Sequence, residues 1–253
     1  MNTDIAKKSK KRVMLTFALP TLILFALSSF LIKPLYIGAS SDVIYKDTVL
    51  VPILEILITI VDNLAYAVCF AGIIYSIFKF TLKKSFGAIS VSFGIFFFKY
   101  LSAFIMDSLS YGYIETTDIL LNLLYLAIDT VKLLLIVFLS NGAIKRYYKN
   151  RAESEKAHAV LGKRLVGIKE ELFDKKAILS FSNPLHCSAF ISAIVILSTE
   201  IISETRYYIV MGFFNSFASA MWMLTDYISD IIIATVIYAL SLLIFSHFYK
   251  KDA

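Results

Sequence analysis

Apolar residues occupy this chain in long stretches, and short polar segments rich in lysine and arginine separate them. The stretches contain about 20 or more residues, which is the length of helix that crosses the hydrocarbon core of a bilayer. The pattern predicts an all-α, polytopic membrane protein that forms a single transmembrane domain over residues 1–253. We expect helices at about 13–36, 48–80, 86–106, 117–144, from Pro184 to a turn at 207–214, and 216–249.

The C-terminal part of the pattern allows two counts of the spans. Residues 207–224 are apolar for 18 positions and would form a separate seventh span, or 207–214 would be the turn before a long sixth helix. We favour six, because seven would place Lys250 and Lys251 on the outer side. The start of the fifth helix is better marked, since Asn183 followed by Pro184 has the chemistry of an N-cap and a first helical position.

Basic residues set the expected orientation. Residues 1–12, 79–84, 145–176 and 250–251 contain 20 of the 25 lysines and arginines, whereas the alternate connections contain only Lys46 and Arg206. The positive-inside rule therefore predicts that both termini lie in the cytoplasm and that the spans form three consecutive helical hairpins in the cell membrane.

Composition agrees with this class. The chain is 58% hydrophobic and 17% charged, against about 25% charged residues in an ordinary soluble domain. The net charge of +6 is explained by the membrane orientation, so we do not expect nucleic acid as a partner. Four prolines and nine glycines beside many Ile, Phe, Tyr and Lys suggest an AT-rich, bacterial genome.

Ionisable residues inside the predicted spans are the main functional candidates, because a charge in the bilayer must pair, face the bundle interior or reach water. Counting from the cytoplasmic lysines at about 1.5 Å per residue places several of them at one depth, in the outer half of the membrane. This candidate intramembrane polar cluster comprises Asp62, Lys99, Asp129, Lys132 and Asp230. It is either a substrate or proton path, or a set of interhelical contacts that fixes packing.

A spacing within the hairpins suggests an internal repeat of the kind found in transporters. A charged residue on each outgoing helix precedes an Asp on the returning helix by 29 or 30 positions, in the pairs Lys33–Asp62, Lys99–Asp129 and Glu200–Asp230. Chance matches among the ionisable residues are an equally good explanation. By depth, Glu55, Glu200 and Lys33 are expected near the outer surface, where they reach the headgroups.

The longest polar segment is a predicted cytoplasmic amphipathic insertion at 145–177. It has ten basic and five acidic residues up to position 176, and one apolar stripe of helical spacing formed by Leu161, Leu165, Ile168 and Leu172. Such a helix suits an anionic membrane surface or a protein partner docked on 150–172.

The sequence lacks the motifs of the common enzyme classes. The three histidines are scattered, the two cysteines lie in apolar stretches, and no nucleophile elbow, P-loop or dinucleotide fingerprint occurs. We therefore expect no enzyme activity, catalytic residue, metal site or cofactor. The leading hypothesis is a small transporter-like protein, or a subunit of a transport complex, with an ion or small molecule as substrate. The alternative is a structural or assembly protein that recruits a partner through its cytoplasmic helix.

Overall fold

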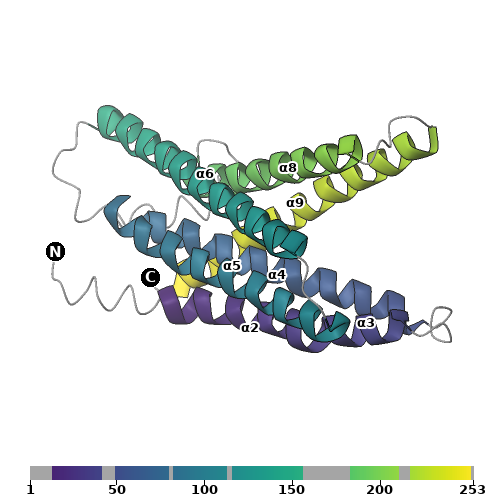
Figure 1. Ribbon diagram of the computed structural model, residues 1–253. Helices are drawn as coiled ribbons and strands as arrows, with labels where there is room; N and C mark the ends of the chain where they lie inside the picture. Colours follow the sequence, from purple (N-terminus) through teal and green to yellow (C-terminus); the bar gives the residue numbers. More distant parts are fainter. Residues whose placement is uncertain are drawn as a thin grey trace.

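Figure 1 shows the computed structural model of the chain, which describes residues 13–41, 49–79, 82–112, 116–155, 183–210 and 217–251. All regular structure in these ranges is helical. Six helical stretches are long and apolar enough to cross a membrane. The chain is thus an all-α, multi-pass membrane protein with six spans, as the sequence predicts.

The first span is one continuous helical path built from four pieces. Two short π-helical segments, η1 (Met14–Ala18) and η2 (Ser28–Ile32), precede the α-helices α2 (Leu19–Leu27) and α3 (Lys33–Ser41). The backbone stays in the right-handed helical region at the junctions, at Ala18 and Ser28. Each other span is a single α-helix: α4 (Leu50–Lys79), α5 (Leu82–Tyr111), α6 (Thr116–Glu155), α8 (Pro184–Val210) and α9 (Phe217–Lys251).

Several expected boundaries were wrong: the first span continues past 36 to Ser41, and α5 covers Leu82–Tyr111 where 86–106 was expected. Helix α6 continues to Glu155, so the insertion predicted at 145–177 begins as an extension of a span. Helix α8 continues to Val210, beyond the expected start of the turn at 207, because Tyr208 is buried and its hydroxyl donates to Asp226 of α9. The apolar stripe of the insertion, Leu161, Leu165, Ile168 and Leu172, lies outside the described residues.

The predicted start of the fifth helix is confirmed. The backbone N–H of Leu185 donates to Asn183 Oδ1 at 2.9 Å, which is the hydrogen bond of an N-cap. Asn183 itself is 5% exposed, so the cap satisfies a donor that water does not reach.

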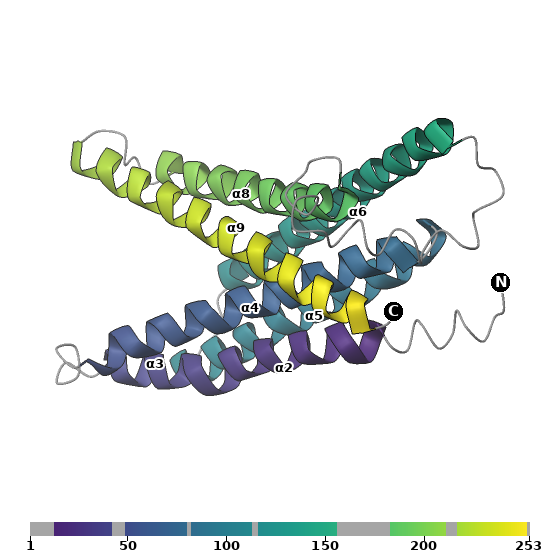
Figure 2. The ribbon, with the colours of Figure 1, turned by 180° about the vertical axis from the view of Figure 1, so that it is seen from behind.

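The three hairpins form a bundle that is open at one end. The start of the first span and the end of α9 lie together at one end, and the pair α8 and α9 diverges from α3 and α4 toward the other, which we call the open end (Figures 1 and 2). Helix α4 is central where the elements converge, since all of residues 67–77 are buried. A Cβ placed on Gly72 would lie 2.7 Å from Phe17 Cβ, so this glycine lets the first span and α4 pack closely.

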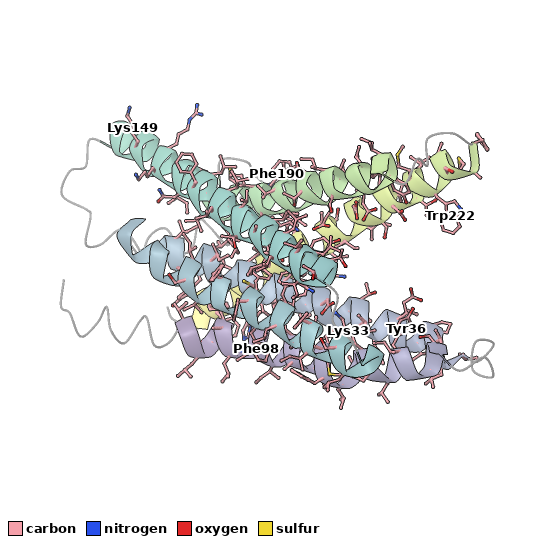
Figure 3. All side chains as sticks on the ribbon, in the orientation of Figure 1. Lys33, Tyr36, Phe98, Lys149, Phe190 and Trp222 are labelled. Atoms are coloured by element: carbon pink, nitrogen blue, oxygen red, sulfur yellow. The ribbon has the colours of Figure 1, made fainter. Side chains whose placement is uncertain are left out.

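Apolar side chains cover the outside of the bundle (Figure 3). Phe138 is 74% exposed on α6 and Trp222 is 67% exposed on α9. Lys149 and Trp222 project near opposite ends of the bundle (Figure 3), where a lipid interface would favour such residues. An exposed apolar surface of this extent indicates contact with a lipid bilayer.

Candidate functional site

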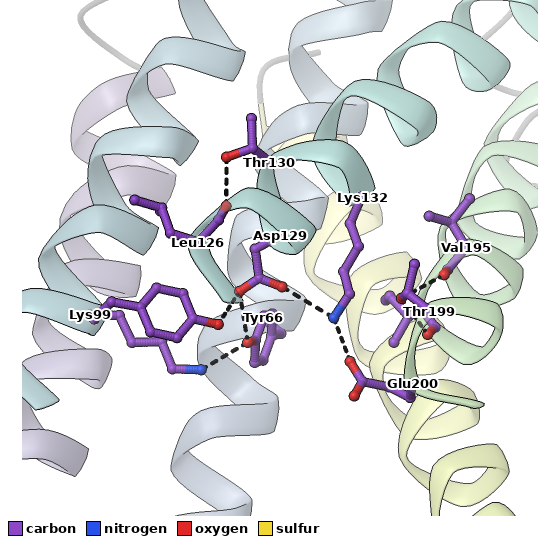
Figure 4. Close-up of polar contacts among 11 residues, drawn as sticks. Tyr66, Lys99, Leu126, Asp129, Thr130, Lys132, Val195, Thr199 and Glu200 are labelled. Carbon is purple, nitrogen blue, oxygen red and sulfur yellow. Dashed lines mark hydrogen bonds and ion pairs between the residues drawn. The ribbon is translucent and has the colours of Figure 1, made fainter. Parts of the chain in front are cut away.

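A buried carboxylate, Asp129, occupies the middle of α6 and organises the polar contacts between the hairpins. Lys132 follows it by one helical turn, and its ammonium lies 3.1 Å from Asp129 Oδ1. The same ammonium pairs with Glu200 of α8 (Figure 4). Asp129 is 2% exposed and Lys132 6% exposed, so a single lysine balances two carboxylates in a place that water barely reaches.

Two tyrosines complete the surroundings of Asp129. Tyr100 of α5 donates to Asp129 Oδ2 at 2.6 Å, and Tyr66 of α4 lies 3.4 Å from the same oxygen. Lys99 donates to the Tyr66 hydroxyl at 2.8 Å (Figure 4). Its ammonium also lies 4.5 Å from the centre of the Tyr66 ring and 5.3 Å from that of Phe25, which are cation–π distances. We call this chain from Lys99 through Asp129 to Glu200 the Asp129 network.

A cavity of about 290 Å³ adjoins the network. Helices α4, α6, α8 and α9 all contribute residues to its wall. Its lining residues are Ile58, Thr59, Asp62, Asn63, Tyr66, Phe70, Lys132, Ile196, Glu200, Asp230, Ile233 and Ile237. Four ionisable side chains on an otherwise largely apolar wall are the composition expected of a site for a small polar ligand.

The structure divides the predicted polar cluster between these two places. Asp129 and Lys99 belong to the Asp129 network, whereas Asp62 and Asp230 line the cavity. Lys132 belongs to both, because its ammonium pairs with Asp129 and its side chain forms part of the cavity wall.

The expectation for Glu200 was wrong. Its side chain is 36% exposed, yet it pairs with Lys132 and lines the cavity instead of reaching the headgroups. The signal was present in the sequence, since Glu200 lies 16 residues after Pro184 and Asp129 lies 16 residues before Lys145. Glu55 is exposed, as its expected position requires, and Lys33 is half-buried.

Sequence reasoning missed Tyr66 and Tyr100 entirely. The chain contains 15 tyrosines, so the residue type alone singles out neither of them. Their neighbours carried the only hint: Tyr100 follows Lys99, and Tyr66 comes four residues after Asp62, on the same face of α4.

The charged pairs of the suggested repeat are not the pairs that form within the described residues. Lys132 of the second hairpin pairs with Glu200 of the third, and Tyr66 of the first links Lys99 to Asp129 of the second. These contacts join hairpins to one another and do not recur within each hairpin.

Two further polar contacts do not involve the cavity wall. His186 Nδ1 and the Tyr238 hydroxyl are 2.7 Å apart and join α8 to α9, and the Ser241 hydroxyl donates to the carbonyl of Ala67 at 3.2 Å. In the part of the chain that the structure describes, no three His, Cys, Asp or Glu side chains are grouped as metal ligands.

The fold and the site define a multi-pass helical membrane protein with a charged cavity between its hairpins. Comparison with known proteins found no matching family, curated protein or solved structure.

Proposed function

We propose that this chain is a small transporter-like protein, or a subunit of a transport complex, that binds an ion or small molecule in the cavity between α4, α6, α8 and α9. The proposed activity includes no chemical step. The observation that carries it is the cavity of about 290 Å³ with Asp62, Lys132, Glu200 and Asp230 on its wall.

The energetics of charges in membranes support this proposal. Each ionised group in the hydrocarbon region costs on the order of 3 kcal/mol or more unless it is paired or reaches water. The Asp129 network needs only Glu200 to complete its ion pairs, so packing alone accounts for Lys132 and Glu200. Asp62 is within electrostatic range of Lys99, but Asp230 remains on the cavity wall without a packing role. A polar ligand or water in the cavity provides a partner for Asp230.

Accessibility of the cavity from the two sides of the membrane tests the proposal. Asn63 lines the cavity, and Asn63→Cys in a chain whose Cys69 and Cys187 are changed to Ala gives a single thiol there. A transporter exposes its site alternately to both sides. We expect a charged, membrane-impermeant methanethiosulfonate reagent to label this thiol both in intact cells and in inverted vesicles.

Val131→Cys is the matched control for this labelling. Val131 is adjacent to Lys132 on α6, at nearly the same depth, and is 51% exposed on the outer surface of the bundle. A thiol there faces lipid and should remain unlabelled from either side. Labelling of Asn63→Cys from one side alone, or from neither, would contradict transport.

A second function is favoured by the Asp129 network itself. Its residues connect α4, α5, α6 and α8 around the buried Asp129, which suits a protein whose charges only hold the bundle together. In that case the protein is an assembly factor that recruits a partner through 150–172. Deletion of 150–172 should then abolish co-purification of the partner and leave the protein in the membrane, whereas unchanged co-purification would count against this function.

We also propose that the protein resides in a bacterial cytoplasmic membrane with both termini in the cytoplasm. The distribution of lysine and arginine supports this orientation, because 20 of the 25 lie in the terminal segments and in the connections at 79–84 and 145–176.

A further inference from the structure

We infer that the cavity accepts an organic cation carrying an ammonium group, with Asp230 and Asp62 as the carboxylates that bind it. The inference rests on the proposed function, since it names the class of solute that the same cavity takes. It depends on three independent features of the described residues: the balance of charge, an unpartnered oxygen, and the shape of the wall.

The cavity wall carries more negative than positive charge. Three carboxylates, Asp62, Glu200 and Asp230, face one lysine, Lys132. The ammonium of Lys132 is already shared between Asp129 and Glu200. Lys99, the other lysine of the network, is within electrostatic range of Asp62 but directs its hydrogen bond to the Tyr66 hydroxyl. A positively charged ligand would restore the balance.

Asp230 supplies an anionic group whose charge is not compensated by a hydrogen bond to Oδ2. Its Oδ2 is buried, and no described residue donates a hydrogen bond to it. A buried carboxylate oxygen without a donor costs more than an ordinary hydrogen bond contributes, so such atoms in native proteins call for a partner. Because Asp230 lies on the cavity wall, a positive charge in the cavity would act on this carboxylate electrostatically and offset part of the cost of its buried oxygen.

Acidic residues also lead from the open end toward Asp230. Glu200 and Glu204 are one turn apart on α8, and Asp226 and Asp230 are one turn apart on the antiparallel α9. Like charges at this spacing repel within each helix. Asp226 accepts a hydrogen bond from Tyr208, which adds no positive charge. The arrangement lowers the electrostatic energy of a cation near the cavity and raises that of an anion.

The shape and lining of the cavity favour an organic cation over a bare ion. Tyr66, Phe70 and four isoleucines form most of the rest of the wall. A metal ion binds its oxygens at about 2.0 to 2.6 Å and would fill little of a space of about 290 Å³, whereas an alkyl body fills it and contacts the apolar wall.

Three probes of one shape and different charge test the inference: choline, its neutral carbon isostere 3,3-dimethyl-1-butanol, and the anion 3,3-dimethylbutanoate. The full chain is placed in nanodiscs whose lipids have no choline headgroup, and binding is measured by calorimetric titration at constant ionic strength, with sodium chloride as the inorganic control. We expect choline to bind at least tenfold more tightly than the alcohol and the butanoate, and sodium not to compete at equal concentration.

Substitutions then locate the site. Asp230→Asn should weaken choline binding at least tenfold, and Asp62→Asn provides a second variant if the first fails to fold. Glu55→Gln is the matched control, because Glu55 is an exposed carboxylate of α4 outside the cavity wall, and it should change the affinity less than threefold.

Equal binding of choline and the alcohol, tighter binding of the butanoate, or unaltered choline affinity in both Asp variants would overturn the inference. Absence of binding by all three probes would overturn it as well. In each of these cases, two-sided labelling of Asn63→Cys would leave the proposed transport function intact, so the two failures are distinguishable.

Discussion

Lys132 carries the positive charge on which the interior of the bundle depends. It is 6% exposed, and its ammonium contacts a carboxylate on its own helix and another on α8. Removing one member of a buried ion pair leaves the other charge without compensation. This destabilises a protein more than replacing the whole pair by apolar residues does. The consequences differ for the two carboxylates, because Glu200 is 36% exposed toward the cavity and Asp129 only 2%.

Lys132→Met should therefore lower the free energy of unfolding by about 3–5 kcal/mol. Unfolding by sodium dodecyl sulfate in mixed micelles measures the change. Most of the loss should come from Asp129, so adding Asp129→Asn should recover more than half of it, since an amide oxygen still accepts the hydrogen bond from Tyr100. Lys145→Met, an exposed position of the same helix, should change stability by less than about 0.5 kcal/mol. Strictly additive losses in the double variant would contradict this account.

Two tyrosine hydroxyls lie near Asp129, and that of Tyr100 is the closer one, donating a hydrogen bond to Oδ2 at 2.6 Å. Tyr100→Phe keeps the ring and removes only that donor, and hydrogen bonds between membrane helices contribute about 0.6 to 1.7 kcal/mol. We expect a loss within this range in the same unfolding titration. Tyr125→Phe is the control, because Tyr125 stacks on Tyr100 at 6.4 Å but is 44% exposed. A loss at least as large for the control would show that removing a tyrosine hydroxyl costs this much wherever it lies, and the hydrogen bond to Asp129 would then not be the cause.

Close approach of two elements depends on a single glycine. Gly72 of α4 faces Phe17 of η1, and the 2.7 Å contact involves Phe17 Cβ, which cannot move without its backbone. Gly72→Ala should separate the first span from α4 and destabilise the bundle by about 1–3 kcal/mol. Gly94→Ala on α5 meets no atom within 4 Å and should stabilise its helix by about 0.5–1 kcal/mol. The opposite signs, measured by thermal unfolding of the two variants, make the pair diagnostic; two changes of the same sign would refute the steric explanation.

The start of α8 depends on a side chain in a similar way. Asn183→Ala removes the acceptor for the Leu185 N–H, and loss of such a cap costs about 1 kcal/mol. Asn183→Asp keeps the acceptor and should be closer to the original protein in the midpoint of thermal unfolding. If Ala and Asp lower the midpoint equally, the cap is not what stabilises this end of the helix.

The helix ends that could be predicted from the sequence are those that local chemistry determines. The ends of α4 and the cap at Asn183 follow from the lengths of apolar stretches and from capping chemistry, and both agree with the structure. The extension of α8 does not follow, because the contact of Tyr208 with Asp226 of α9 sustains this helix through the expected turn.

The site was partly predictable for the same reason. Counting residues from the cytoplasmic lysines placed Asp62, Asp129 and Asp230 at a common depth, and depth is a local property of a helix. Which of them pair and which line a cavity depends on how the helices rotate and diverge, and no spacing in one sequence contains that information. The network and the cavity wall therefore emerged only in three dimensions.

At the scale of the molecule, divergence of α8 and α9 from α4 explains why one helix has two different surroundings. Residues 67–77 of α4 are enclosed on all sides, whereas Ile56, Leu57 and Ile60, nearer the open end, are exposed. The cavity lies at this transition, between Ile58 and Phe70 of α4. The third hairpin therefore contacts α4 in two ways: Ser241 of α9 donates to the carbonyl of Ala67 in the enclosed part, and residues of α8 and α9 line the cavity nearer the open end.

The orientation of the whole bundle is the remaining prediction. The two ends of the described chain lie at one end of the bundle and the end of α5 at the other (Figures 1 and 2). Since most basic residues flank the first of these ends, a green fluorescent protein fused after Ala253 should fluoresce and a phosphatase fused there should be inactive. Fusions to a chain truncated after Gly112, which follows α5 with φ of +71°, should behave in the opposite way. Phosphatase activity at the C-terminal fusion would reverse the orientation, and with it the side of the membrane toward which the open end of the bundle faces.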